Sequence, residues 1–477
     1  MRLYVGAVSV IAGAGLIALW TSADKFASEQ CAGSGAAHEI AACTRLLETG
    51  RLDAVARSKF AGSRALANQI AGNTAAALAD FELALANDTA NVPALLNRAV
   101  AHGLAQRFDQ AAADYSKVIE LQPANAKALA SRGVVMAKQG KVAEALSDLD
   151  RAVTFDPKFA AAYQERAAIQ AGRQAWDNAA TDVSKAIEID PTLADAYKLR
   201  ASIHARKGDG KAAVADLAKA VELVPDDVES IFNLALINEH LGDLEAAIGG
   251  YGRSIAAQPG LAVAYVKRGL ALAKLGRAEQ ALPDLDKAVR FSANDAGLLR
   301  MRSVVHNMTG NYASAIADLD AASAIAPQDL GLVGGLGLAQ FYNGDFAASA
   351  KALRQVFETT PSPLELLFGY IAQVRAGGAE KANAMAELKA GAALFEPTAW
   401  PAPIAGLFLG ERTPQAALAA ATSADQRCEA QFYVGEWHLL QGDAAAAKTA
   451  LTAAVDVCPK PFIEAIAASA ELRRLRR

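Results

Sequence analysis

Seven prolines lie at multiples of 34 residues from one another. They are Pro123, Pro157, Pro191, Pro225, Pro259, Pro327 and Pro361, and Ala293 occupies the one missing place. A fixed period of this size predicts a stacked array, because each unit is too small to bury a core without its neighbours. With the proline at position 32 of the repeat, nine units begin at Ser58, Val92, Ala126, Ala160, Ala194, Val228, Ala262, Ala296 and Leu330. The array therefore covers residues 58–363.

Small and turn-forming residues recur at fixed places inside each unit. Position 8 is always Ala, Gly or Ser, and position 20 is Ala in eight units and Ser349 in the ninth. Small side chains let two antiparallel helices approach closely. Position 15 is Gly in seven units, where a left-handed residue ends a first helix, and the proline follows a second helix. Each unit is therefore predicted to be a helix, a tight turn and a second helix.

The composition favours helices throughout and argues against binding of nucleic acid. Hydrophobic residues make up 53% of the chain with only 6% aromatic residues, since alanine, the strongest helix former, supplies the largest share of the apolar count. The 47 basic and 51 acidic residues are interspersed and leave a formal net charge of -4, so no basic face is expected. We therefore expect an all-α protein without a nucleic-acid partner.

The pattern of small residues at positions 8, 20 and 27, an apolar or aromatic residue at 24 and proline at 32 resembles the tetratricopeptide repeat (TPR). This resemblance implies an all-α, right-handed α-α superhelical solenoid of about nine consecutive 34-residue units. It also implies a concave wall, built from the first helix of each unit, that binds peptides or partner helices. Recognition of other proteins is thus the expected function.

Arginine at position 7 and aspartate at position 23 occur together in seven units and are both absent from the other two. Because the two residues occur together within one chain, we predict an ion pair between the two helices of each unit. The pairs would form an interior ladder, one rung in each unit, that sets the register of the helices. The alternative is a row of phosphate-binding arginines. The pairs are Arg64 with Asp80, Arg98 with Asp114, Arg132 with Asp148, Arg166 with Asp182, Arg200 with Asp216, Arg268 with Asp284, and Arg302 with Asp318.

The concave wall is expected at positions 2, 5, 9, 12 and 13, and position 9 is apolar in eight units. The candidate partner-binding residues around that stripe are Lys138, Lys198, Arg206, Phe232, Lys274, Arg300, Phe341 and Tyr342. An apolar groove with basic side chains suits an amphipathic helix or an extended peptide that carries acidic groups. The alternative is that position 9 is partly buried between neighbouring helices and that the charges are merely solvated.

The N-terminus carries an export segment. Residues 3–23 contain no charge, follow Arg2 and precede Asp24, so residues 1–23 are either a cleaved signal peptide or an anchor in the inner membrane. Residues 24–57 contain one helix, around residues 38–49, that is expected to cap the array. The run from Cys31 to Gly50 resembles the start of other exported repeat proteins of Gram-negative bacteria. The expected location is the periplasm, with membrane contact only through an uncleaved N-terminal segment.

Four cysteines form two local pairs at opposite ends of the chain. Export permits disulfides, and a solenoid keeps its ends apart, so the expected bridges join Cys31 to Cys43 and Cys428 to Cys458. The second bridge closes the open end of a helix hairpin and is worth about 3 to 4 kcal/mol in the chain-entropy treatment. A zinc site would need all four cysteines together and is not expected.

After the array we predict a divergent helix pair at 364–396 and a proline-rich connector with a short helix at 397–424, interpreted as a hinge or rigid spacer. A further TPR-like hairpin and a capping helix follow at 425–477. The residues from Glu429 to Asp443, together with Phe462 to Leu472, resemble the C-terminal part of the "new lipoprotein I" type of envelope adaptor. That resemblance implies a scaffold that brings envelope enzymes to their substrates.

No sequence pattern for a catalytic, nucleotide-binding or metal site is present, so no cofactor is expected. Four histidines, His102, His204, His306 and His438, recur at position 11 and lie too far apart in the array to share a metal. We therefore predict a non-catalytic scaffold or adaptor. The alternatives are a periplasmic carrier of a small acidic peptide or sugar, and an enzyme hidden in residues 364–427, where Glu365, Glu387, Glu396 and Arg412 are the available charged groups.

Overall fold

The structure is a computed structural model that describes residues 29, 31, 36–459 and 462–476. In these residues twenty-six helices, α2 to α27, follow one another, and the same residues contain no strand. The chain divides into two compact units, Met1–Gly208 and Asp209–Arg477. The predicted all-α solenoid of paired helices is therefore the architecture within each unit.

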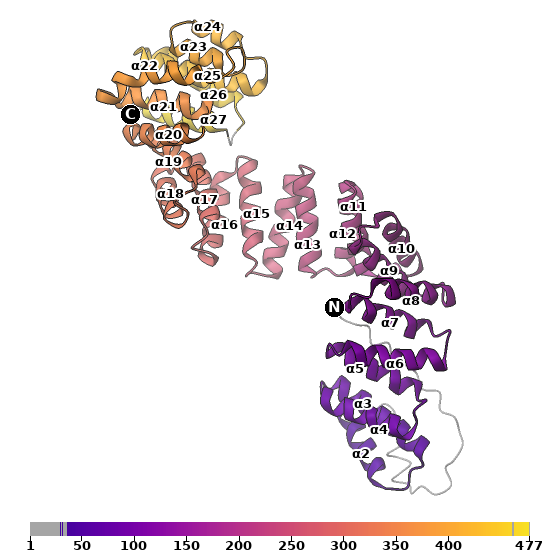
Figure 1. The fold of residues 1–477 in the computed structure, drawn as a ribbon. Coiled ribbons are helices and arrows are strands. Elements are labelled where there is room, and N and C mark those ends of the chain that lie inside the picture. Colours follow the sequence, from indigo (N-terminus) through magenta and orange to yellow (C-terminus); the bar gives the residue numbers. More distant parts are fainter. Residues whose placement is uncertain (1–28, 30, 32–35, 460–461, 477) are drawn as a thin grey trace. The chain divides into compact units, whose positions relative to one another are not determined.

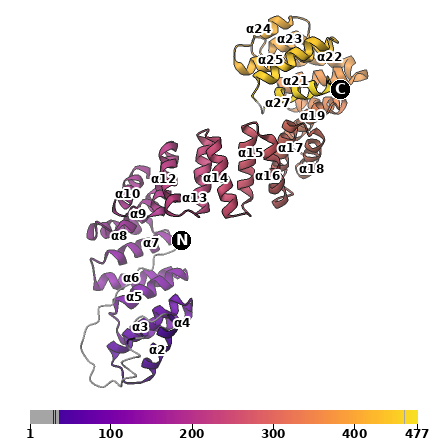
Figure 2. The ribbon, with the colours of Figure 1, turned by 180° about the vertical axis from the view of Figure 1, so that it is seen from behind.

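The first unit consists of a capping helix and stacked hairpins, which follow one another in chain order in both ribbon views (Figures 1 and 2). The cap is α2 (Ala36–Glu48). The hairpins are α3 (Ala54–Ile70) with α4 (Thr74–Asn87), α5 (Val92–Leu104) with α6 (Phe108–Leu121), α7 (Ala126–Lys138) with α8 (Val142–Phe155), and α9 (Ala160–Gly172) with α10 (Trp176–Ile189), and α11 (Ala194–Arg206) ends the unit.

The second unit continues the repeat and ends in a bundle. It begins with α12 (Gly210–Leu223), followed by α13 (Val228–His240) with α14 (Leu244–Ala257), α15 (Ala262–Lys274) with α16 (Ala278–Phe291), α17 (Ala296–Thr309) with α18 (Tyr312–Ile325), and α19 (Leu330–Asn343) with α20 (Phe346–Thr359). The helices after α20 are α21 (Pro363–Ala376), α22 (Gly378–Ala392), α23 (Ala402–Phe408), α24 (Pro414–Ala419), α25 (Ala424–Leu440), α26 (Ala444–Val457) and α27 (Ile463–Arg474), here called the C-terminal bundle.

The small residue at position 8 is required by the close approach of the two helices in a hairpin. A Cβ atom placed on Gly133 would lie 3.0 Å from the Ala145 carbonyl oxygen and 3.1 Å from Leu149 Cγ. The same addition on Gly435 in the C-terminal hairpin would lie 2.6 Å from Leu451 Cγ. Since close packing leaves no room for a larger side chain, this position accepts only Ala, Gly or Ser.

Position 15 is left-handed in all nine predicted repeats. The seven glycines there have φ between 76° and 90°. The two units without glycine carry Gln106 (φ 57°) and Gln174 (φ 62°), which adopt the same region. The turn therefore imposes the left-handed conformation on whatever residue stands there, although a side chain makes it unfavourable.

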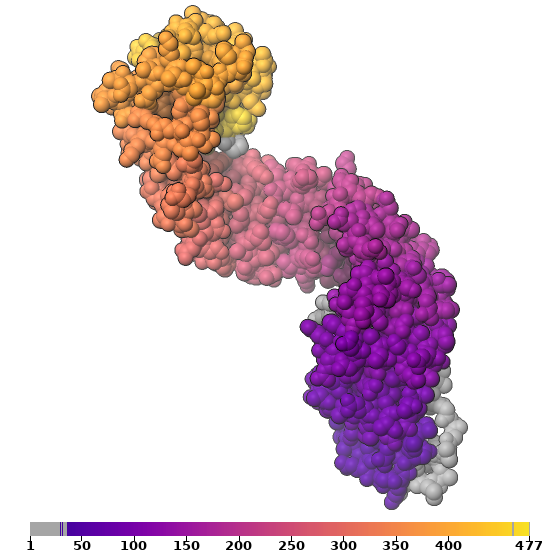
Figure 3. Space-filling view, in the orientation of Figure 1, coloured from indigo at the N-terminus to yellow at the C-terminus, as the bar shows by residue number. Residues whose placement is uncertain are grey.

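The proline-rich connector is not a spacer. Ile404 and Leu407 of α23 are fully buried, and Phe408 is only 6% exposed. They belong to one hydrophobic cluster that also contains residues of α19, α21, α25 and α27. The interpretation of residues 397–424 as a hinge or rigid spacer is therefore wrong, because the apolar run Ile404–Phe408 finds a core in the C-terminal bundle, which has a rounded outline in Figure 3.

Both expected disulfides are formed. Cys31 is bonded to Cys43 and Cys428 to Cys458, and all four side chains are buried. No helix among the described residues is long and apolar enough to cross a membrane. The predicted export segment at residues 3–23 lies outside the described residues.

Replacing Gln106 or Gln174 by glycine is expected to stabilise the protein by about 0.5 to 1 kcal/mol. Glycine removes the steric cost of the left-handed conformation, and the higher entropy that it gives the unfolded chain offsets only part of this gain. The measurement is urea denaturation followed by circular dichroism. Gln122→Gly is the matched control. Because Gln122 has φ -137°, glycine there relieves no strain and only raises the entropy of the unfolded chain, so this variant should not be stabilised. Equal effects of the Gln106 and Gln122 substitutions would contradict the explanation.

Candidate functional site

Six Arg–Asp pairs join the two helices of their hairpins. In each pair the Nε and Nη2 atoms of the arginine donate to the two oxygens of the aspartate carboxylate, as in Arg132 to Asp148 at 2.7 and 2.8 Å. The same geometry holds Arg64 to Asp80, Arg98 to Asp114, Arg166 to Asp182, Arg268 to Asp284, and Arg302 to Asp318. The remaining predicted partners, Arg200 and Asp216, belong to different compact units.

The arginines also reach the preceding hairpin, a contact that the sequence analysis did not predict. The Nη1 atom of Arg132 donates to Ser116 at 2.9 Å, and that of Arg166 to Asp150 at 2.7 Å. Arg302 reaches Asp286 in the same way, and Arg64 reaches Thr44 on the capping helix. These acceptors recur 16 or 20 residues before the arginine. In these hairpins the arginine therefore also ties its unit to the element before it.

The arginine charges are paired with carboxylates inside the array. The hydrogen bond to Asp182 and, more weakly, that to Asp150 raise the pKa of Arg166 above its usual value. The bond to Asp148 likewise raises the pKa of Arg132. Because the carboxylates satisfy these guanidinium groups, the row is structural and does not favour the phosphate-binding alternative.

The hairpin α13–α14 lacks the pair and is held differently. Gly250 stands where the aspartate would be, and a Cβ atom there would lie 2.6 Å from Ala235 Cβ. The hydroxyl of the buried Tyr251 donates to Glu239 at 2.7 Å, and Lys267 and Lys274 of the next hairpin bind the same carboxylate. A different polar cluster therefore takes over the role of the Arg–Asp pair.

The candidate partner-binding residues fall into two groups. Lys138, Arg206 and Arg300 are exposed, and Lys198 lies 3.2 Å from Asp195 on its own helix. Lys274 is half exposed but already paired with Glu239 at 2.9 Å. These basic residues and the half-buried Phe232 belong to the first-helix surface, defined here as positions 2, 5, 9, 12 and 13 of the first helices.

Apolar side chains are also exposed on the first-helix surface. Leu236 and Val304, both at position 9, are 37% and 45% exposed, and Val263 at position 2 is 45% exposed. In the first unit Ile70 and Leu104, both at position 13, are 64% and 60% exposed. Position 9 is partly buried in the other leucine and valine units, so the stripe is exposed in some hairpins and packed between helices in others.

Phe341 and Tyr342 do not belong to this surface. They are 0% and 3% exposed and form part of the core of the C-terminal bundle. Phe341 packs edge-on against Phe368, and the Tyr342 hydroxyl donates to the Ile463 carbonyl at 3.5 Å. The prediction that these two residues meet a partner is wrong, because α27 covers α19.

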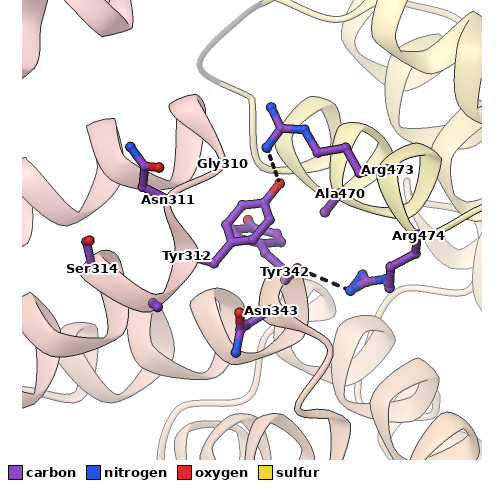
Figure 4. A pocket seen from close by; sticks show the side chains of 10 residues that line it. Gly310, Asn311, Tyr312, Ser314, Tyr342, Asn343, Ala470, Arg473 and Arg474 are labelled. Atoms are coloured by element: carbon purple, nitrogen blue, oxygen red, sulfur yellow. Dashed lines mark hydrogen bonds between the residues drawn. The ribbon is translucent and has the colours of Figure 1, made fainter. Parts of the chain in front are cut away.

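Arginines at the end of α27 fix it on the repeats. Arg474 donates to the carbonyl oxygens of Phe341 and Tyr342 at the end of α19, at 3.2 and 3.1 Å through Nη1. Arg473 lies beside Gly310 and donates to the Tyr312 hydroxyl at 3.4 Å (Figure 4). The last carbonyls of a helix carry partial negative charge, which favours a cation at that place.

Beneath α27 lies a buried ionic network. Arg375 of α21 binds Glu471 of α27 at 2.6 Å and Glu436 of α25 at 3.3 Å, and both carboxyl groups are nearly inaccessible. Burial and the neighbouring Glu471 raise the pKa of Glu436 well above that of a free glutamate. Burial also raises the pKa of Glu464, at the start of α27, to about 7. Three helices distant in sequence therefore meet at one arginine.

Within each compact unit the helices form a solenoid of paired helices, and comparison with known proteins shows which repeat family three segments of it match. Residues 96–159, 198–262 and 266–329 match the tetratricopeptide repeat family model. The chain carries tetratricopeptide repeats. No curated protein matches it, and the resemblance to "new lipoprotein I" stays a prediction.

Solved TPR structures are similar to parts of the chain. YrrB, a TPR protein with an unusual peptide-binding site, is 23% identical over 38% of this chain and 92% of its own, with a TM-score of 0.35. The type IV pilus biogenesis factor PilW is 20% identical over 42% and 94%, with a TM-score of 0.40. The C-terminal part of a TPR protein from Cytophaga hutchinsonii is 16% identical over 50% and 99%, with a TM-score of 0.43.

Removing Asp148 is expected to cost about 2 kcal/mol of unfolding free energy, because Arg132 would keep a poorly solvated charge without its carboxylate. The double substitution R132L/D148A, which copies Leu336 and Ala352 of the ninth unit, should lose less than Asp148→Ala alone. A double-mutant cycle by urea denaturation measures the coupling. Additive losses would contradict a coupled pair.

Unfolding free energy should fall as the pH rises from about 5 to 7, since Glu464 keeps its proton in the folded state after the unfolded chain has lost it. The substitution Glu464→Gln removes this titration and should raise stability at pH 8 by on the order of 2 kcal/mol. Urea denaturation at four pH values measures the slope. The exposed Glu411→Gln is the control, and an unchanged slope in Glu464→Gln would contradict the assignment.

Proposed function

We propose that this protein is a non-catalytic scaffold or adaptor of the cell envelope that binds a peptide or partner helix on its first-helix surface. The observation that carries the proposal is the pairing of exposed apolar and basic residues there. In the second unit Leu236 and Val304 are exposed, with Arg300 and Lys274 as neighbouring basic residues. An apolar strip with cationic margins suits an amphipathic segment that carries acidic groups.

The structure limits where such a segment can bind in the second unit. Because α27 covers Phe341 and Tyr342 of α19, the first-helix surface from α13 to α17 is the part left for a partner. In the first unit the same surface runs from α3 to α11, with Ile70 and Leu104 as its most exposed apolar side chains. The binding residues we propose are therefore the six exposed or half-exposed candidates without Phe341 and Tyr342.

Location in the envelope is supported by the two disulfides, since such bonds persist in oxidising compartments. The uncharged segment at residues 3–23 supports export, either as a cleaved signal or as an anchor. The match to the TPR family supports a role as a scaffold rather than an enzyme, and so does the use of the Arg–Asp pairs for packing between helices. The described residues contain no cluster of His, Cys, Asp or Glu that could hold a metal ion.

In-cell photocrosslinking tests the proposal. A photoreactive residue in place of Arg206 in the first unit, or of Val304 in the second, is expected to capture a defined envelope protein. Lys185 and Lys219, on second helices of the same two units, are the matched outer positions and should not capture it. The captured protein should then bind purified wild-type chain, and Val304→Glu should weaken this binding at least about tenfold, because a buried unpaired charge is unfavourable.

Equal capture at inner and outer positions would overturn the assignment of the surface. Absence of capture together with a co-purifying small acidic peptide or sugar would replace the adaptor by the carrier. An acidic segment in the captured partner would support the role of Arg206, Arg300 and Lys274.

A further inference from the structure

One row of side chains in the first unit changes from apolar to basic along the array. Position 13 is the last residue of the first helices α3, α5, α7, α9 and α11. In chain order these residues, here called the position-13 row, are Ile70, Leu104, Lys138, Gly172 and Arg206. All of them are exposed, and the two apolar side chains are 64% and 60% exposed. A segment that runs along this row therefore meets two apolar side chains first and two cations afterwards.

The two cations of the row are available to a partner. Lys138 and Arg206 form no ion pair in the described part of the chain, and the helices α3, α5 and α7 contain no aspartate or glutamate. Lys138 and the half-buried Glu165 of α9 attract each other, but burial dominates and raises the pKa of Glu165. Since a full positive charge outweighs the partial negative charge at a helix end, the row is complementary to acidic groups.

The spacing of the row fits a chain in the polyproline II conformation. First helices of neighbouring hairpins contact one another, as α3 contacts α5 and α9 contacts α11, and packed helices lie about 8 to 10 Å apart. A polyproline II chain has about three residues per turn and rises about 3.1 Å per residue, so every third side chain returns to the same face after about 9 Å. A β-strand, with a period of two, turns alternate contacts away from the row. One side chain in three of such a segment therefore falls on each hairpin.

Two glycines leave the backbone of this surface open to close approach. A Cβ atom on Gly103, next to Leu104, or on Gly172 would meet nothing within 4 Å. Glycine suits places where another backbone comes close, and the backbone of a polyproline II chain is itself fully exposed. The surface therefore accepts the main chain of an extended segment as well as its side chains.

We propose that the position-13 row binds an extended acidic segment of a partner protein in the polyproline II conformation, with apolar side chains at i and i+3 and acidic ones at i+6 and i+12. The apolar side chains would pack on Ile70 and Leu104, and the acidic ones would pair with Lys138 and Arg206. Place i+9 falls at Gly172, which has no side chain to select there. This inference rests on the use of the first-helix surface proposed above, and it adds the order and the spacing of the partner's side chains.

Fluorescence anisotropy with full-length protein and synthetic peptides tests the order. The first fluorescein-labelled peptide has leucine at places 1 and 4, glutamate at places 7 and 13, and proline, serine and alanine elsewhere. The second has the same composition with places 4 and 7 exchanged, which sets glutamate against Leu104 and leucine against Lys138. The first peptide should bind at least about tenfold more tightly, because only it matches apolar to apolar and acid to base.

A charge exchange tests the contact with Lys138. Lys138→Glu should weaken binding of the first peptide about tenfold, and a peptide with lysine at place 7 should bind this variant more tightly than the wild type. Lys185→Glu, which makes the same charge change on the second helix α10, is the matched control and should bind like the wild type. Circular dichroism melting of each variant separates loss of binding from loss of fold.

Three results would overturn the inference. They are equal binding of the two peptides, binding of the first peptide with a Kd weaker than about 1 mM, and no rescue of Lys138→Glu by the lysine peptide. Tighter binding of an alanine-rich helical peptide with the same leucines and glutamates on one face would assign the row to an amphipathic helix and would equally overturn it.

Failure of this inference is distinguishable from failure of the proposed function. Capture of an envelope protein from Val304 in the second unit, without binding of the first peptide, would overturn the inference and leave the adaptor in place. Binding of the peptides in the expected order, with no protein captured from any inner position, would overturn the adaptor function and leave the order and spacing in place.

Discussion

The close approach of two antiparallel helices is the constraint on which the rest of this protein depends. It requires a small residue at position 8, as the contacts around Gly133 show, and a left-handed residue at the turn, as in Gly140. Two helices packed this closely leave room for a short, bidentate Arg–Asp bridge between them, in which the carboxylate is almost fully buried. Because the arginine also reaches the previous hairpin, the same contact that closes one unit stacks it on its neighbour.

The two hairpins that lack the Arg–Asp pair, α13–α14 and α19–α20, are each held by other contacts. In α13–α14 the pair is replaced by Gly250, by the buried Tyr251 and by a carboxylate shared with two lysines of the next hairpin. In α19–α20 it is replaced by Leu336 and Ala352, and α27 with Arg474 supplies new contacts to the same helix. Loss of the ion pair is thus tolerated where polar or apolar contacts from elsewhere hold the hairpin.

The C-terminal bundle changes what the repeats can do at that end. Position 13 is exposed in other hairpins, as in Ile70 and Leu104, but becomes core at Tyr342 when α27 covers α19. The same packing buries the network of Arg375, Glu436 and Glu471, which draws α21, α25 and α27 together. The first-helix surface of α19 is therefore part of the core, whereas that of α13 to α17 keeps exposed apolar side chains.

The repeat could be predicted from the sequence, as could the hairpin in each unit, six of the Arg–Asp pairs and the two disulfides, because all of these depend on contacts between residues at short, fixed spacings. The left-handed Gln106 and Gln174 could also have been found, since they occupy the glycine position of their units. The sequence did not predict that Ile404 and Leu407 are core residues or that Phe341 and Tyr342 are covered. Phe341 and Tyr342 are covered because helices more than a hundred residues apart meet in space, as Tyr342 meets Ile463. Ile404 and Leu407 are buried because α23 packs against α22, α24 and α25, and no repeat spacing encodes either arrangement.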